Sequence, residues 1–309
     1  MTAARAVVFG YHDVGVRCLK TLISGGVDVP LVVTVADDPN ETQWFASVAA
    51  TAAHYGIKAI TPSDANTPEL QRTLSALQPD FIFSFYYRSI LGAPLLRIAR
   101  LGALNMHGSM LPKYRGRAPV NWAILRGERE TGATLHYMVE RADAGEIVDQ
   151  LAVPILQDDD AREVFAKVTV AAETVLARSL PGLIAGTAPR RIQPIEPGHY
   201  FGRRRSEDGR IDWAWPAGQI HNLVRAVAPP FPGAFADVGG ERWWIHRTRV
   251  ATRSASPSSS ARLVGTNGQC HVECVDGSVL QLLAAVTAAG PLNLEALAAE
   301  LSRKPRLLA

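Results

Sequence analysis

Cysteine is scarce in this chain of 309 residues, which contains only Cys18, Cys270 and Cys274. An odd and sparse set of cysteines argues against a disulfide framework and fits a reducing compartment. The run Cys270-His271-x-x-Cys274 lacks the second pair of ligands that would complete a zinc site, and alternation along a strand explains it better. We therefore expect neither a disulfide framework nor a bound metal.

Long hydrophobic runs are absent as well, because the longest fall far short of the roughly 20 residues that span a bilayer. The N-terminus, MTAARAVVFG, enters a strand pattern directly and lacks the separate apolar core and cleavage site of a signal peptide. We therefore expect a cytoplasmic protein with no stable membrane insertion.

A strong excess of one charge is also lacking, since 32 Lys and Arg residues against 29 Asp and Glu residues leave a net charge of +3. This value is too small to indicate a nucleic-acid partner. Hydrophobic residues make up 47% and charged residues 20%, near globular averages, which argues against wholesale disorder. A length of 309 residues favours two ordinary domains.

The first half of the chain alternates between strand and helix patterns, which is typical of an α/β fold with a mostly parallel sheet. Gly10 and Gly15 flank an expected turn over residues 11–15 but do not form a G-x-G-x-x-G motif, so a dinucleotide site is not indicated. The expected strands are residues 6–10, 29–35, 57–60, 80–85 and 133–139, and the expected helices are 16–22, 42–55, 68–77 and a long one that starts within 156–163 and continues to Ala185.

Prolines and arginines gather after this long helix, and we interpret residues 189–204 as a linker between domains 1–188 and 205–309. Short strand patterns dominate the second domain, with Asp276-Gly277 as a tight turn. The serine-rich stretch 252–261 is of low complexity and is expected to be a mobile loop. The expected strands are residues 211–213, 243–246, 262–264, 270–275 and 279–286.

Three residues near the middle of the chain form a candidate catalytic set. Asn105 and His107 are two apart, so on an extended segment both side chains point to the same face, and the run Gly108-Ser109-Met110-Leu111-Pro112 ends the strand. Asp143 lies in a small-residue turn after the next expected strand. A carboxylate beside an imidazole favours the charged imidazolium and fixes its tautomer, while an amide N–H can bind an oxyanion. The set suits acyl transfer to an amine, although spacing alone also fits a solvated histidine and a turn-forming aspartate.

Longer motifs around these residues favour the catalytic interpretation. The run Asn105-Met106-His107-Gly108-Ser109, together with residues 111–122, Glu130-Thr131-Gly132 and Asp143-Ala144-Gly145, resembles the signature of 10-formyltetrahydrofolate-dependent formyltransferases. Matches at residues 201–204 and 225–235 extend the resemblance across most of the chain. It implies a Rossmann-like N-terminal catalytic domain and a smaller, β-rich C-terminal domain that resembles an OB-fold.

The resemblance also implies residue roles. Asn105 would stabilise the oxyanion, His107 would transfer protons and Asp143 would orient His107. 10-Formyltetrahydrofolate would be the co-substrate, and the residues implied to line its pocket are Ser89, Ile90, Leu91, Arg117, Val139, Glu140, Arg141, Ala142 and Asp143.

The form Arg-Gly-Arg-Ala-Pro-x-Asn-Trp at residues 115–122 is most similar to family members that act on UDP-4-amino-4-deoxy-L-arabinose in lipid A modification and polymyxin resistance. Such an acceptor needs cationic groups for its diphosphate, although a run of arginines is also typical of a solvated face. The candidate acceptor-binding residues are Tyr87, Arg115, Asn121, Trp122, Arg203 and Arg204.

Several alternatives stay open at this point. Methionyl-tRNA formyltransferases share the Asn-x-His and Asp residues, but residues 36–47 here are acidic to neutral, where that enzyme carries a basic insertion. Enzymes acting on dTDP- or GDP-linked amino sugars, a formyltetrahydrofolate hydrolase and a non-enzymatic binding module are further alternatives. Because the chain stops at Ala309, a decarboxylase activity is expected on a separate polypeptide, and the oligomeric state is left open.

Overall fold

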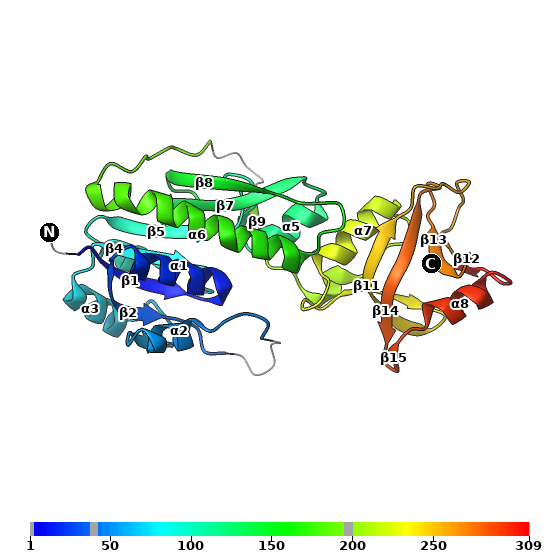
Figure 1. Cartoon of the computed structure of the whole chain (residues 1–309), viewed down its shortest axis with the longest axis horizontal. Helices are drawn as coiled ribbons and strands as arrows, with labels where there is room; N and C mark the ends of the chain where they lie inside the picture. The colour runs from blue at the N-terminus through cyan, green and yellow to red at the C-terminus, as the bar shows by residue number, and fades with distance from the viewer. Residues whose placement is uncertain (1–2, 38–42, 195–199, 309) are drawn as a thin grey trace. The chain divides into compact units, whose positions relative to one another are not determined.

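The computed structural model describes residues 3–37, 43–194 and 200–308 (Figure 1). The chain forms two compact units, of which the first contains residues 1–119, 130–154 and 165–202. The second unit contains residues 120–129, 155–164 and 203–309. Two short segments of the second unit therefore precede its main segment in the sequence. The domain limits 1–188, 189–204 and 205–309 expected from the sequence stay a prediction.

The first unit is built on a seven-stranded sheet with the order β3-β2-β1-β4-β5-β7-β8. The strands from β3 to β5 are parallel, and β7 and β8 continue the sheet as antiparallel strands. Near-continuous apolar sequences such as FIFSF in β4 explain why the inner strands are buried on both faces. The strands are β1 (Arg5–Gly10), β2 (Asp28–Val33), β3 (Lys58–Ile60), β4 (Phe81–Phe85), β5 (Gly102–His107), β7 (Glu130–Tyr137) and β8 (Ile147–Pro154).

Helices cover both faces of this sheet. On one face, Phe9 and Ile82 pack in a cluster with Leu74 of α3. Figure 1 shows α1 and α6 running over the other face, where Arg17 and Glu173 join these two helices in an ion pair of 2.7 Å. The helices are α1 (His12–Ser24), α2 (Val48–His54), α3 (Pro68–Leu77), α4 (Ala93–Leu96) and α6 (Ala161–Ala185).

The strand order reverses at β1, because β2 and β3 lie on one side of it and β4 and β5 on the other. Ligands of open parallel sheets bind outside the carboxyl ends of the strands at such a switch point. The chain segments that leave these ends are therefore the first place to look for a functional site. A short parallel ladder between β6 (Arg115–Gly116) and β9 (Tyr200–Phe201) lies outside the main sheet.

The second unit contains an antiparallel sheet with the order β10-β11-β14-β13-β12-β16, and β15 also pairs with β14. Its core gathers Trp213, Ile220, Trp243 and Leu280 with other buried apolar residues from the sheet and from α7 and α8. The elements are β10 (Ala234–Val238), β11 (Glu241–Val250), β12 (Arg262–Thr266), β13 (Gln269–Glu273), β14 (Val279–Thr287), β15 (Gly290–Pro291), β16 (Arg306–Leu307), α7 (Ala217–Ala226), α8 (Leu294–Leu301) and a 3-10 turn at Ser206–Gly209. In the sequence, the chain passes from the first unit to the second at the start of helix α5 (Pro119–Leu125).

The predicted fold class is confirmed: a mostly parallel α/β sheet is followed by a smaller, β-rich part. Several local predictions are wrong. Helix α1 begins at His12, so residues 11–15 are not a separate turn. Helix α2 begins only at Val48, because Ser47 caps it by accepting from the N–H of Ala50. Residues 156–160 precede helix α6 rather than starting it, and Asp160 and Glu163 form reciprocal side-chain bonds to each other's N–H at its start.

The serine-rich stretch 252–261 has no regular secondary structure, yet it is bonded to the turn that follows β13. The N–H of Ala255 donates to the carbonyl of Gly277 at 2.8 Å, and the N–H of Ser258 donates to that of Val275 at 3.0 Å. Asp276-Gly277 does form the predicted turn, and Gly277 has a φ of 84°, which glycine adopts without strain.

Helix α6 is long and apolar enough to cross a membrane by length and composition. However, 44% of its most apolar stretch is buried within the protein, and core helices of soluble proteins have the same character. The helix is therefore weak evidence for a membrane span.

Candidate active site

Asn105 and His107 lie at the carboxyl end of β5, which β4 separates from β1, where the strand order reverses. The antiparallel pairing with β7 places Asn105 opposite His136 and His107 opposite Thr134. Gly108 follows, and a Cβ added there would collide with the hydroxyl of Tyr86. Tyr86 leaves little room for a side chain at Gly108, and the position of Asn105 and His107 at the end of β5 places both at the sheet edge where ligands bind.

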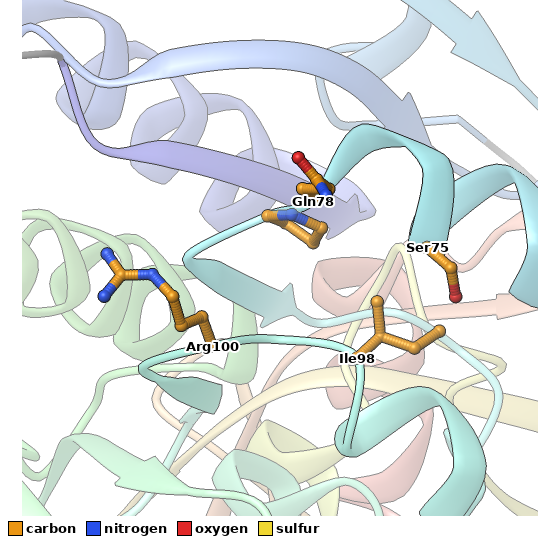
Figure 2. Close-up of a pocket in the computed structure, with 5 residues that line it drawn as sticks. Ser75, Gln78, Ile98 and Arg100 are labelled. Atoms are coloured by element: carbon orange, nitrogen blue, oxygen red, sulfur yellow. The ribbon is translucent and has the colours of Figure 1, made fainter.

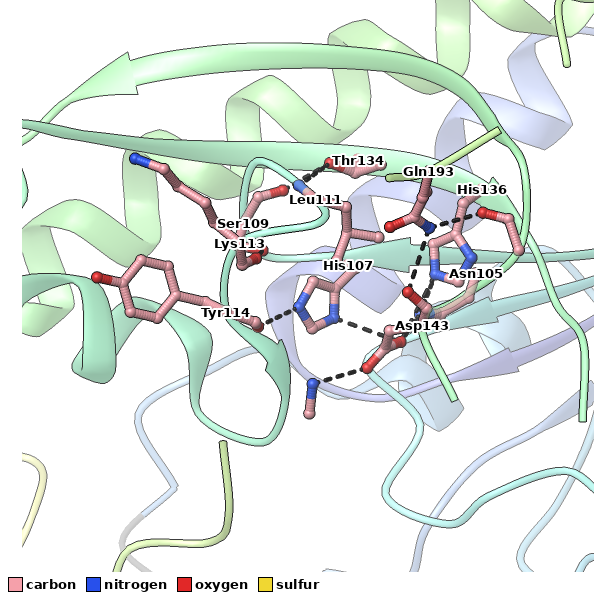
Figure 3. Close-up of polar contacts among 12 residues, drawn as sticks. Asn105, His107, Ser109, Leu111, Lys113, Tyr114, Thr134, His136, Asp143 and Gln193 are labelled. Atoms are coloured by element: carbon pink, nitrogen blue, oxygen red, sulfur yellow. Dashed lines mark hydrogen bonds and ion pairs between the residues drawn. The ribbon is translucent and has the colours of Figure 1, made fainter. Parts of the chain in front are cut away.

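Asp143 approaches these two residues from the loop between β7 and β8 (Figure 3). Its Oδ1 atom lies 3.4 Å from Asn105 Nδ2 and 3.6 Å from His107 Nδ1. Its Oδ2 atom accepts a hydrogen bond of 2.9 Å from the N–H of Gly116. The structure thus brings together the three residues that the sequence analysis selected.

The contacts of His107 fix its tautomer. Its Nε2 atom lies 2.8 Å from the carbonyl oxygen of Tyr114, which can only accept, so Nε2 carries a proton. Nδ1 faces Asp143 and is the nitrogen left for proton exchange. When Nδ1 takes up a proton, the adjacent carboxylate stabilises the imidazolium.

The carboxyl group of Asp143 is held ionised. Burial alone would raise its pKa, but His107, His136 and the N–H of Gly116 more than offset that effect and hold the pKa of Asp143 well below its usual range. A permanently charged carboxylate is what a proton-transferring histidine needs beside it.

His136 and Gln193 also belong to this cluster, and the sequence analysis missed both. His136 is 1% exposed, and its Nε2 atom lies 3.2 Å from Asn105 Nδ2. Gln193 Nε2 donates to the backbone carbonyls of Asp143 and Gly145 at 3.2 and 2.6 Å. His136 could have been found from its place in the expected strand 133–139, whereas no local pattern marks Gln193.

Most of the residues implied for a folate pocket lie on the loops that follow β4 and β7, and Arg117 lies between β6 and α5. Leu91 is buried in a hydrophobic cluster against which Met138 also packs, so residues that follow β4 and β7 share one apolar cluster. Ile90 and Val139 are 69% and 46% exposed, which leaves apolar side chains open to solvent or ligand. Asn66 holds the first loop by donating to the Ile90 carbonyl at 3.0 Å. The remaining members are distributed as follows: Ser89, Arg117, Glu140 and Arg141 are exposed and Ala142 is half-buried.

The candidate acceptor-binding residues do not form one cluster. In the first unit, Tyr87 packs edge-on against Phe9 at 5.3 Å, and Arg115 is buried near Asp143 and Arg141. Burial is the main cause that lowers the pKa of Arg115.

The other four candidates belong to the second unit. The guanidinium of Arg204 lies 5.0 Å above the ring of Trp122, while Arg203 is exposed. Asn121 is buried, and its amide donates to the carbonyl of Ala226 at 2.7 Å. Of this set, the Trp122–Arg204 pair has the chemistry of a surface that binds a ring and an anion.

A pocket of about 420 Å³ lies far from this cluster, at the amino ends of β4 and β5 (Figure 2). Its lining residues are Ser75, Gln78, Pro79, Ile98 and Arg100. Arg100 is paired with Asp80, and the pocket contains neither a carboxylate nor a histidine in its lining. Within residues 3–37, 43–194 and 200–308, no group of His, Cys, Asp and Glu side chains is arranged to hold a metal ion.

Comparisons with known proteins agree with the geometry. The formyl transferase family model matches residues 4–180, and the model of the formyl transferase C-terminal domain matches residues 204–298. An N-formyltransferase from Helicobacter canadensis, solved with folinic acid and dTDP-3-aminofucose, is 21% identical with a TM-score of 0.72 and covers 90% of this chain and 98% of its own.

Two further solved structures are similar. A sugar 3N-formyl transferase, WlaRD, in the presence of dTDP and 5-N-formyl-THF is 19% identical, with a TM-score of 0.71 over 95% of this chain and 99% of that one. A sugar N-formyltransferase from Shewanella sp. is 19% identical, with a TM-score of 0.63 over 82% and 99%. At such identities the likeness establishes a shared fold.

Proposed function

The chain belongs to the formyl transferase family, and on that premise we propose that it transfers the formyl group of 10-formyltetrahydrofolate to the amine of a nucleotide-linked amino sugar. The observation that carries the proposal is the meeting of Asn105, His107 and Asp143 at the carboxyl end of β5. The folds of N-formyltransferases solved with dTDP or a dTDP-linked amino sugar support the substrate class.

The reaction would begin when the unprotonated amine attacks the formyl carbon. A C–N bond forms, and the carbonyl oxygen becomes an anion that the amide N–H of Asn105 stabilises by about 3 kcal/mol. Nδ1 of His107 takes the proton that the amine loses, while Asp143 stabilises the resulting imidazolium. The same proton then passes to N10 of the folate as the C–N10 bond breaks, which releases tetrahydrofolate and the N-formyl sugar.

The most specific form of the proposal names UDP-4-amino-4-deoxy-L-arabinose as the acceptor. It is supported by the Arg-Gly-Arg-Ala-Pro-x-Asn-Trp sequence at residues 115–122. The protein would then act in the cytoplasm in lipid A modification. A dTDP-linked amino sugar is the second candidate, because two similar structures contain dTDP or a dTDP sugar.

A release assay tests these statements. Purified protein is mixed with 10-formyltetrahydrofolate, and tetrahydrofolate is followed with the UDP sugar, with a dTDP-linked amino sugar, with methionyl-tRNA and without an acceptor. Turnover only with the UDP sugar supports UDP-4-amino-4-deoxy-L-arabinose as the acceptor. Turnover with the dTDP sugar supports a role in the synthesis of a surface polysaccharide instead. Turnover with tRNA or without an acceptor contradicts the sugar proposal.

Substitution of the three residues is the second test. Asn105→Ala, His107→Ala and Asp143→Ala should each lower kcat by about a hundredfold or more, because each removes a charge or proton function from the transition state. Arg100→Gln is the matched control, since it breaks an exposed ion pair with Asp80 at the opposite end of the sheet. Full activity in folded His107→Ala would refute the assigned chemistry.

A further inference from the structure

The segment that reads as a linker in the sequence is bonded to the loop that carries Asp143. Arg191 exchanges two backbone hydrogen bonds with Ile147, at 2.8 and 2.9 Å, where strand β8 begins. Farther along, Phe201 accepts from the N–H of Arg117 at 2.9 Å, next to the β6–β9 ladder. The described parts of the segment therefore contact the end of the Asp143 loop at Ile147 and the residue next to Gly116, whose N–H donates to Asp143.

Gln193 makes the central contact of this segment. Its side chain is 5% exposed, and its Nε2 atom donates to the carbonyls of Asp143 and Gly145 at 3.2 and 2.6 Å (Figure 3). Because both partners are carbonyl oxygens, only the NH2 group can face them. Oε1 is buried and has no partner among the described residues, so the N–H donors alone tie this side chain to the loop.

The Asp143 loop needs such support. Asp143 has a φ of 54°, a left-handed conformation that a non-glycine residue adopts at some cost. Gly145 packs so tightly that a Cβ would collide with the carbonyl of Tyr137. Gly116 fixes the carboxylate end of Asp143 through Oδ2, while Gln193 fixes its backbone end.

We propose that Gln193 is a positioning residue, which holds the Asp143 loop where the carboxylate reaches His107 and Asn105. This inference rests on the proposed formyl transfer for its effect on turnover. Its structural part, the immobilisation of residues 143–145, is independent of the reaction.

Two variants separate the donor from the rest of the side chain. Gln193→Met removes the donor and the acceptor, and Gln193→Glu keeps the length and one oxygen but sets a carboxylate against two carbonyls. Both should lower kcat roughly a hundredfold, because misplacement of a catalytic group by about 1 Å has that effect. Ile192→Ala is the control. Ile192 is the residue next to Gln193 and is 84% exposed, so its replacement should leave kcat unchanged.

A double-mutant cycle distinguishes positioning of Asp143 from a general loss of structure. If Gln193 acts through Asp143, Gln193→Met should have no further effect on single-turnover rates in an Asp143→Asn background. Losses that multiply, or a Gln193→Met variant with the activity of the parent protein, would overturn the proposal.

Amide hydrogen exchange measures the loop itself. Gln193→Met and Gln193→Glu should increase exchange of peptides covering residues 141–147 at least tenfold, whereas Ile192→Ala should not. Unchanged exchange would overturn the proposal even if activity fell. Faster exchange in a protein that transfers no formyl group to any acceptor would support the role of Gln193 and reject the proposed function instead.

Discussion

Asp143 and His136 together orient the amide of Asn105. The carboxylate of Asp143 can only accept, so the group of Asn105 that faces it at 3.4 Å is NH2. Nδ1 of His136 carries a proton because it lies 2.9 Å from the carbonyl of Tyr137, and its Nε2 atom lies 3.2 Å from the same NH2 group, from which it accepts, and 3.6 Å from Asp143 Oδ1. One N–H of this group donates to His136. The other makes only a long contact of 3.4 Å to Asp143, so it can donate to a developing oxyanion.

Removal of that acceptor should reduce catalysis without preventing folding. We expect His136→Leu to lower kcat by roughly ten- to a hundredfold, because Asn105 loses the contact that aims its N–H group. His136→Gln should retain more activity, since a side-chain oxygen can again accept from Asn105. Steady-state kinetics with 10-formyltetrahydrofolate, with thermal unfolding as the check on folding, measures both.

Tyr137→Phe is the control for this pair. It keeps the backbone carbonyl that His136 contacts and the ring below the guanidinium of Arg190, 4.0 Å away. Equal activity of His136→Leu and Tyr137→Phe would show that Asn105 needs no help from His136.

Helix α7 is the element that connects several segments within the second unit. His221 bonds to Thr248 Oγ1 and to the Gln157 carbonyl, each at 2.9 Å. The guanidinium of Arg225 donates to the carbonyls of Leu156 and Asp159 at 3.3 and 3.2 Å. The last turn of α7 offers the Ala226 carbonyl to Asn121, so α7 fastens two segments that are distant in sequence.

Asn121 should therefore act on stability more than on substrate affinity. We expect Asn121→Ala to reduce the free energy of unfolding by about 1–3 kcal/mol, because it leaves the buried Ala226 carbonyl without its donor. The Michaelis constant for the amino sugar should stay within about twofold of the parent value, far below the roughly tenfold change that a lost 1.4 kcal/mol of binding would cause.

Trp122→Ala gives the matched comparison for Asn121→Ala. It removes the ring below Arg204 and should raise that Michaelis constant if this pair contacts the acceptor. Denaturant unfolding and initial-rate kinetics on both variants check the two expectations. If Asn121→Ala increased the Michaelis constant strongly and Trp122→Ala did not, Asn121 would be a residue that binds the acceptor.

Across the whole molecule, the sequence predicts what depends on local patterns and misses what depends on distant contacts. The spacing of apolar residues in PELQRTLSAL, with Pro68 in the first turn and Thr67 as the cap, predicts α3 with its observed bounds. Asn105 and His107 are predictable because two residues on one strand share a face. Gln193 was missed because it lies in a proline-rich stretch that looks like a linker, and its partners are 48 and 50 residues earlier in the chain.

Trp44 and Phe45 show how tertiary packing overrides a helical pattern. Both lie in the helix expected over residues 42–55, yet they precede α2 and pack on His12 instead, with ring centroids at 4.4 and 4.0 Å. Phe165 lies on the same imidazole at 4.3 Å. No pattern within residues 42–55 could reveal that these two rings pack on a largely buried imidazole more than 30 residues earlier, at His12.

The largely buried imidazole of His12 makes the stability of the molecule sensitive to mild acid. Burial, with a smaller contribution from Arg88, lowers the pKa of His12 from 6.5 to about 3, although Asp13 lies 3.7 Å away. Burial also lowers the pKa of His221, His246 and His271 in the second unit. The unfolded chain binds protons at these sites near pH 6.5 and the folded protein does not, so stability is lost as the pH falls below 6.5.

Protonation linked to His12 alone should remove roughly 2 kcal/mol of stability between pH 6.5 and pH 4.5, because the slope rises from half of its full value of about 1.4 kcal/mol per pH unit at pH 6.5. Asp143 acts in a different range, because its lowered pKa stabilises the fold above its ordinary value of 3.8 and that stability is lost only in stronger acid. Urea unfolding at pH 7.5, 6.5, 5.5 and 4.5 should show a steeper pH dependence for the parent protein than for His12→Asn, which tolerates the left-handed backbone at this position. Parallel profiles for the two proteins would mean that His12 takes up its proton while folded, and that the aromatic rings around it do not exclude the charge.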